Sequence, residues 1–76
     1  MSATAHADKL VRMANQIGQF FRSQPHDDAV TGISDHIRAF WTPKMRRDIA
    51  EHISTGGTGL DPLAQEAIQR LTGANK

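Results

Sequence analysis

The sequence predicts an all-α protein, a small bundle of four short helices joined by short turns that contain proline and glycine. Apolar residues recur at intervals of three and four in four stretches of the chain, which is the spacing of one face of an α-helix. No stretch shows the sustained alternation of β-branched residues that is typical of a strand. We expect a single helical domain at residues 8–72, preceded by a disordered extension at residues 1–7 and followed by a frayed tail at residues 73–76.

The first helix is expected from about Asp8 to Arg22, and Ser23-Gln24-Pro25 ends it. Its apolar residues cover close to half of the helix circumference, whereas a helix with one core-facing side needs a stripe of only about 100°. These residues are Leu10, Val11, Met13, Ala14, Ile17, Phe20 and Phe21. We therefore expect more apolar surface on this helix than one neighbouring element would bury.

The second helix is expected from about Asp28 to Trp41, with Asp27 or Asp28 as its N-cap. Thr42-Pro43 then predicts a sharp break, because the residue before a proline avoids the helical region and proline suits the first position of a helix. The third helix runs from there to about Ser54.

The turn at residues 55–59 offers a glycine for the left-handed position that follows many helices. Asp61-Pro62 repeats the cap-and-proline pattern and predicts the start of the fourth helix. The apolar stripes of the last two helices are Met45, Ile49 and Ile53, and Leu63, Ala64, Ala67, Ile68 and Leu71.

The composition argues against several classes of protein. Nine Lys and Arg stand against eight Asp and Glu, whereas a nonspecific nucleic-acid binder usually carries a clear basic excess. No apolar run approaches the ~20 residues that span a bilayer, and Met1 to Lys9 contain no signal-peptide core. We expect a cytoplasmic protein that binds neither nucleic acid nor membrane. Because 76 residues with 38% apolar content and no cysteine build only a small core, a protein partner is the expected source of further stability.

Neither the histidines nor the glycines predict a site for chemistry. A zinc site uses three or four ligands at set spacings, such as a histidine pair at i, i+4, and the histidines lack such a pair. The glycine cluster at residues 56–59 lacks the Lys-Ser/Thr of a phosphate-binding loop, and Pro62 removes a donor N–H. We expect no catalytic residue, no cofactor site and no metal site. The histidines are His6, His26, His36 and His52.

The basic cluster Lys44, Arg46 and Arg47 leaves an alternative open. With the break at Thr42-Pro43, the second and third helices could imitate a helix-turn-helix, and Arg46 and Arg47 could enter the major groove of DNA. Asp48 and Glu51 follow at once, so a solvated or partner-facing strip is the favoured interpretation. A small DNA-binding regulator remains the alternative.

Three blocks of sequence resemble the delta subunit of the soluble, NAD-linked, molybdenum-containing formate dehydrogenases. The blocks are MANQIGQFF at residues 13–21, FWTPKMR at residues 40–46 and GGTGLDPL at residues 56–63. The likeness runs over about residues 8–71, and its specificity comes from the three blocks occurring together in this order.

The resemblance implies a non-catalytic accessory subunit of a bacterial, cytoplasmic enzyme. That enzyme oxidises formate and passes electrons through iron–sulfur clusters and FMN to NAD. Its molybdopterin site, with molybdenum or tungsten, and its clusters belong to larger subunits. The delta chain is expected to dock on the large catalytic subunit and to support the stability of the complex or the insertion of the molybdopterin cofactor.

The adjacent aromatic residues are the expected anchors for that partner. Neighbouring residues on a helix point about 100° apart, so each aromatic pair either divides between the core and a loop or offers one ring to an interface, where aromatic residues are enriched. Homodimerisation through the first helix is a third possibility. The predicted partner-binding residues are Asn15, Gln16, Phe20, Phe21, Phe40, Trp41 and Arg46.

Overall fold

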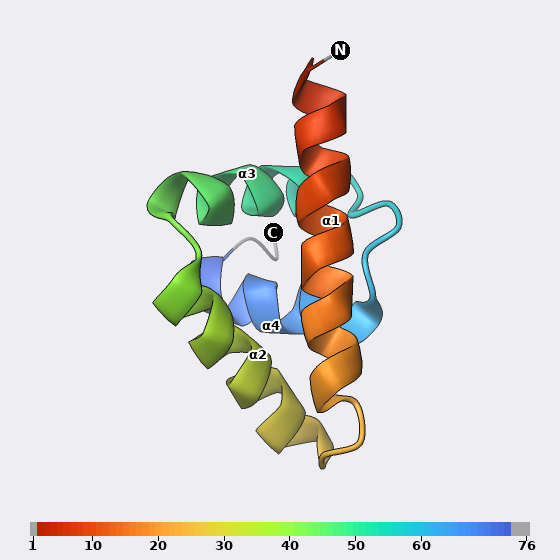
Figure 1. The fold of residues 1–76 in the computed structure, drawn as a ribbon, viewed down its shortest axis with the longest axis vertical. Helices are drawn as coiled ribbons and strands as arrows, with labels where there is room; N and C mark the ends of the chain where they lie inside the picture. The colour runs from red at the N-terminus through yellow and green to blue at the C-terminus, as the bar shows by residue number, and fades with distance from the viewer. Residues whose placement is uncertain (1, 74–76) are drawn as a thin grey trace.

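Four α-helices pack into one bundle in the computed structural model, which describes residues 2–73 and the side chains of residues 7–73 (Figure 1). No strand occurs within that range, so the predicted all-α fold is confirmed. The helices are α1 (Ser2–Phe21), α2 (His26–Phe40), α3 (Pro43–Ser54) and α4 (Pro62–Thr72).

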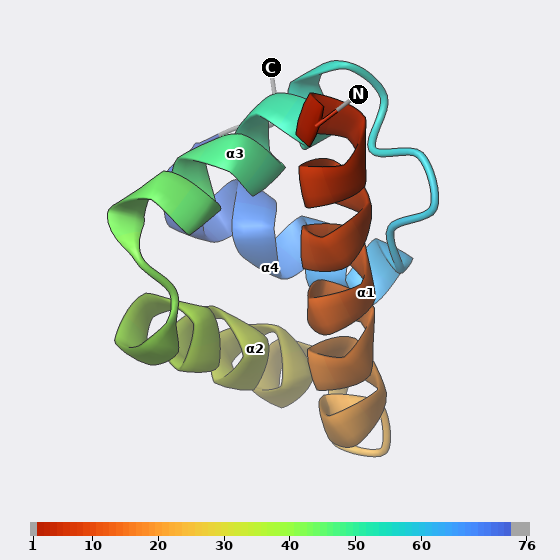
Figure 2. The same ribbon diagram turned by 45° about the horizontal axis from the view of Figure 1, so that its top comes forward.

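The helices α1 and α2 meet at the short loop that joins them and diverge away from it (Figure 1). The helix α3 lies across the open side between their far parts, as Figure 2 also shows. The helix α4 packs most extensively on α2 and also contacts α1 and α3. The result is that α1 has three helical neighbours rather than one.

The ends of the described chain differ from the predicted boundaries. The helix α1 begins at Ser2 and so includes residues 2–7, for which the sequence predicts a disordered extension. This segment contains three alanines and neither proline nor glycine, so nothing in its sequence stops a helix. At the other end Gly73 caps α4 with a left-handed φ of 74°, and the rest of the predicted tail lies outside the described residues.

The start of α2 corrects a prediction. Its N-cap is Pro25, which makes no side-chain cap, and the helix begins at His26 rather than at Asp28. The N–H of Ala29 donates to the carbonyl of Pro25 at 2.8 Å. Asp27 and Asp28 therefore lie inside the first turn, where carboxylates interact favourably with the positive end of the helix dipole.

The caps of α3 and α4 are as predicted. The Thr42 hydroxyl accepts a hydrogen bond from the N–H of Met45 at 3.1 Å, and the Asp61 carboxylate accepts from the N–H groups of Leu63 and Ala64 at 3.2 and 3.3 Å. Proline follows each cap at the start of the helix. These bonds satisfy donors that a helix start otherwise leaves open.

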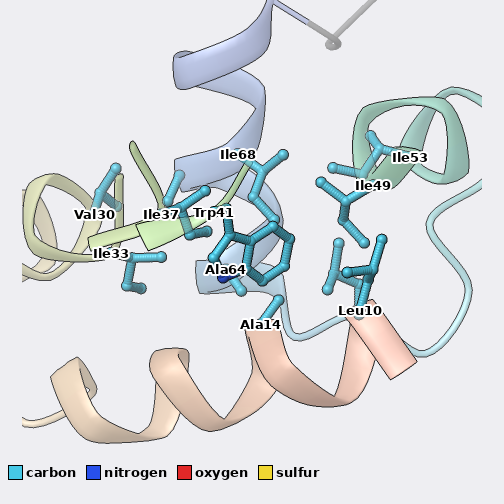
Figure 3. Close-up of a cluster of buried hydrophobic side chains, with 12 residues drawn as sticks. Leu10, Ala14, Val30, Ile33, Ile37, Trp41, Ile49, Ile53, Ala64 and Ile68 are labelled. Atoms are coloured by element: carbon cyan, nitrogen blue, oxygen red, sulfur yellow. The ribbon is translucent and has the colours of Figure 1, made fainter. Parts of the chain in front are cut away.

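One hydrophobic core is shared by all four helices (Figure 3). The ring of Trp41 lies at its centre, between the isoleucines of α2 on one side and Ile49 and Leu10 on the other. The hydroxyl of Ser34, the buried polar residue, donates to the carbonyl of Ala67 at 3.0 Å. The buried residues of this core are Leu10, Ala14, Val30, Ile33, Ile37, Trp41, Ile49, Ile53, Leu60, Ala64, Ala67 and Ile68.

The wide apolar arc of α1 is mostly covered within the bundle. Leu10 and Ala14 are fully buried, and Met13 and Ile17 are packed against the core while still partly exposed. Phe20, which is 76% exposed, is the residue of this arc that remains mostly in water. Because α1 contacts three helices, apolar side chains that a single neighbouring helix would leave exposed are covered.

Asn15 attaches α1 to the glycine turn that precedes α4. Its Nδ2 donates to the carbonyl of Gly59 at 3.0 Å, and its Oδ1 accepts from the N–H of Asp61 at 2.7 Å. Positive φ values of 65° at Gly57 and 81° at Gly59 shape this turn, and such values favour glycine. The glycine cluster is therefore a structural turn, in keeping with the sequence-based interpretation.

We expect Asn15→Ala to lower the free energy of unfolding by about 1–3 kcal/mol, because it leaves a half-buried N–H and a carbonyl without their partners. Urea denaturation followed by circular dichroism measures this loss. Gln19→Ala is the matched control, since Gln19 is exposed on the same helix and its substitution should change the free energy by less than about 0.5 kcal/mol. Equal stability of the two variants would contradict the role assigned to Asn15.

A surface ion pair joins the start of α2 to α4. Nε2 of His26 lies 2.9 Å from Oε1 and 3.1 Å from Oε2 of Glu66, and Nη2 of Arg70 lies 2.9 Å from Oε2. The hydrogen bond from His26 is the largest cause that lowers the pKa of Glu66 below its ordinary 4.5, and the charges of His26 and Arg70 lower it further against the opposing effect of burial.

We expect the pKa of Glu66 to rise towards its ordinary value in the variant His26→Ala, which removes the largest cause of the shift. A carboxyl with a lowered pKa stabilises the fold above its unfolded pKa, and that contribution disappears as the pH falls through the folded pKa. The carboxyl ¹³C resonance of Glu66, titrated by NMR in both proteins, measures the difference. An identical titration midpoint would show that His26 does not act on Glu66.

Candidate partner-binding groove

An open groove of about 550 Å³ lies between α1 and α2, and we call it the α1–α2 groove. Its lining is mostly apolar, with Gln16 and His36 as the polar residues. The helix α1 contributes five of the lining residues and the rest come from α2, the α2–α3 connection and α3. The lining residues are Met13, Gln16, Ile17, Phe20, Phe21, His36, Phe40, Trp41 and Met45.

A close contact between Phe21 and Gly32 closes one end of the groove. A Cβ atom placed on Gly32 would lie 2.5 Å from Cε1 of the Phe21 ring, so the ring rests directly on the backbone of α2. The two helices diverge from here (Figure 1). Trp41, which is almost fully buried, forms the inner wall of the space between them.

Two exposed phenylalanines border this groove. Phe20 is 76% exposed and Phe40 is 72% exposed, and they are the exposed large hydrophobic residues of the described chain. The ring of Phe20 packs edge-on against Phe21 at a centroid distance of 5.1 Å, and the ring of His36 lies 4.7 Å from that of Phe40. Each ring is thus supported by a neighbour while much of its surface faces water.

The structure brings five of the seven predicted partner-binding residues together in this groove. One of them, Trp41, is only 5% exposed and also belongs to the core. Its backbone at φ −91° and ψ 142° has left the helix, so the ring turns inward while Phe40 stays outside. The five residues are Gln16, Phe20, Phe21, Phe40 and Trp41.

Asn15 and Arg46 lie outside the groove lining. The amide of Asn15 is occupied by the glycine turn, and Nη1 of Arg46 donates to the carbonyl of Arg38 at 3.2 Å near the end of α2. The neighbouring Arg47 is exposed.

Four lining residues were not among the predicted contacts. Met13 and Ile17 belong to the apolar arc of α1, and their position on that arc was the signal that could have identified them. His36 and Met45 come from α2 and α3, and the apolar arc of α1 gave no signal for them.

The histidines, the carboxylates and the glycine turn were the residues considered for a metal or a phosphate, and the structure describes the side chains of residues 7–73. No group of three or more His, Cys, Asp or Glu side chains comes together among them. In the glycine turn, the N–H groups of Gly56 and Gly57 donate to the carbonyls of Ile53 and His52 at 3.0 Å each, so these donors are already used. None of the helices in the described range is both long and apolar enough to cross a lipid bilayer.

Comparison with known proteins identifies a family for this chain. The model of the family described as NADH-dependent formate dehydrogenase delta subunit FdsD matches residues 9–68, which is most of the 76-residue chain. These residues include all three sequence blocks and every residue that lines the α1–α2 groove. No curated protein and no solved structure matches.

Three of the aromatic residues should differ sharply in how much their substitution lowers the free energy of unfolding. We expect Phe20→Ala and Phe40→Ala each to change the free energy of unfolding by less than about 0.5 kcal/mol, because both rings are mostly in water. Trp41→Ala should cost about 3–5 kcal/mol through the cavity that it opens, which is enough to unfold so small a domain. Urea denaturation of the three variants measures this, and a folded, stable Trp41→Ala protein would contradict the assignment of Trp41 to the core.

Proposed function

The chain belongs to the family of NADH-dependent formate dehydrogenase delta subunits, and from this we propose that it is a non-catalytic accessory subunit that docks on the large molybdenum-containing subunit and stabilises it. The observation that carries the proposal is the α1–α2 groove with Phe20 and Phe40 exposed at its borders. The proposal also places the chain in the cytoplasm, with the NAD-linked enzyme that it would join.

The placement of the exposed aromatic surface supports docking. Most surface apolar residues of a monomer are scattered singly, whereas an apolar patch next to a groove marks an interaction site. Here both exposed phenylalanines border one groove and come from two different helices. Aromatic residues at the centre of an interface often supply a large part of the binding free energy, so Phe20 and Phe40 are the anchors we propose.

The lining of the groove supports a stabilising role over direct handling of the molybdopterin cofactor. A phosphorylated pterin is held by arginine or lysine side chains or by free N–H groups at a helix start. The polar residues of this lining are Gln16 and His36, and no cation is among them. We therefore propose that the molybdopterin, the iron–sulfur clusters and the FMN are held by the partner subunits.

Docking would stabilise both proteins. A partner that binds only the folded form of a protein raises its apparent stability by mass action, and a 76-residue helical domain has little stability of its own to spare. Covering Phe20 and Phe40 would also remove apolar surface from water, which is the main favourable term in most protein association.

We expect the double variant Phe20→Ala/Phe40→Ala to lose at least about tenfold in affinity for the large subunit, since two anchors of this kind commonly contribute more than 2 kcal/mol together. Co-expression with a tagged large subunit, followed by quantification of the bound chain, measures the loss.

The control for this experiment is Thr31→Ala/Glu51→Ala, which changes two exposed residues that do not line the groove. It should be recovered with the large subunit at the level of the unchanged chain. Equal recovery of the aromatic double variant would remove the basis for docking through the α1–α2 groove.

A further inference from the structure

We infer that the occupant of the α1–α2 groove is an amphipathic helix of the partner, apolar on the side that enters the groove and bearing carboxylates on the flank that faces α1. This inference rests on the proposed function and goes further, because it specifies the kind of segment that binds and its orientation.

The dimensions of the groove suit a helix. Its lining on α1 runs from Met13 to Phe21, which corresponds to about 12 Å, or roughly two turns, of an α-helix. A helix lying in such a groove inserts apolar side chains at i, i+3 or i+4, and i+7. Met13 and Met45 lie among the lining residues, and their flexible thioethers adapt to inserted side chains as rigid residues do not.

Two positively charged residues of α1 lie just beyond the end of the groove lining, on the N-terminal side of Met13. Lys9 lies one helical turn before Met13 on the same face, and Arg12 lies one turn before Gln16 at the margin of that face. Both are exposed, and neither has an ion-pair or hydrogen-bond partner in the described structure.

Two carboxylates of the neighbouring elements, Asp48 and Asp35, are engaged in ion pairs of their own. Asp48 on α3 lies 2.9 Å from Nζ of Lys44, and Asp35 on α2 lies 3.2 Å from Nη1 of Arg38. No carboxylate lines the groove, and the two cations of α1 outnumber the one carboxylate next to them on this helix, Asp8. Complementary charge orients partners and raises the rate of association, and here the complement is a carboxylate-bearing flank.

The same charges argue against a second copy of this chain as the occupant. In a twofold dimer each subunit presents the same surface to the other, so Lys9 and Arg12 of both copies would be brought to one interface. Like charges at an interface cost affinity, and this groove offers no carboxylate in its lining to offset them.

The charge test compares Arg12→Glu with Arg47→Glu, a pair matched in residue type, exposure and change of net charge. The affinity of each full-length chain for the large subunit is measured by biolayer interferometry at low and high salt. We expect Arg12→Glu to weaken binding about tenfold at low salt, with the gap shrinking at high salt, and Arg47→Glu to change it less than about twofold. Equal effects of the two substitutions would overturn the inference.

The occupant is identified by placing the photo-cross-linker p-benzoylphenylalanine at position 20 and mapping the cross-linked peptide by mass spectrometry. A helical segment of the large subunit with apolar residues at i, i+3 or i+4 and adjacent carboxylates is the expected result. A neutral or basic segment, or a second copy of this chain, would overturn the inference.

The two proposals fail separately. If Phe20→Ala/Phe40→Ala loses the large subunit while Arg12→Glu keeps full affinity, docking stands and the acidic helix is wrong. If the aromatic double variant keeps the large subunit, docking through the α1–α2 groove is wrong, whatever the result for Arg12→Glu.

Discussion

The contact between Phe21 and Gly32 fixes how closely α1 and α2 approach at one end of the α1–α2 groove. Because glycine has no Cβ, the ring of Phe21 lies directly on the backbone of α2, and the two helices approach most closely at the end where they are joined. Further from this contact they diverge (Figure 1). The divergence leaves Trp41 as an inner wall and Phe20 and Phe40 as exposed borders, so one missing side chain underlies both the groove and its aromatic edges.

The helix α1 has three structural roles because different parts of its circumference face different parts of the molecule. One side, with Leu10 and Ala14, enters the core, and another carries Asn15, which holds the glycine turn before α4. The third, with Met13 and Phe20, faces the groove. The broad apolar arc seen in the sequence is therefore not a general excess of exposed surface, and what the bundle leaves uncovered is concentrated at a few positions. In protein interfaces, too, most of the binding free energy comes from a few residues, many of them aromatic.

The local signals in the sequence predicted much of the fold. Thr42-Pro43 and Asp61-Pro62 carry a cap and a compatible proline, which are decided within one helical turn, and both helix starts are confirmed. The long-range contacts were not predictable from such signals. The two hydrogen bonds of Asn15 join residues 44 and 46 positions apart, so the sequence pattern could not distinguish an internal bond from one offered to a partner. Trp41 was ambiguous for a different reason, since helical periodicity no longer applies where the backbone leaves the helix.

The residues that form the core differ from those that the groove would use for recognition. Binding through the groove would therefore not compete with the stability of the fold. Trp41, Ile37 and Ile49 are removed from water within the chain itself, so the bundle does not need a partner to cover its centre. Phe20 and Phe40 contribute little to that burial, and the cations Lys9 and Arg12 are not engaged in holding the helices together. In the proposed complex, the rings would supply affinity through apolar burial and the cations would select the orientation of the partner. Substitutions at the exposed groove residues should therefore leave the fold intact. Substitutions at Trp41 or Asn15 would destabilise the fold and would affect binding only indirectly.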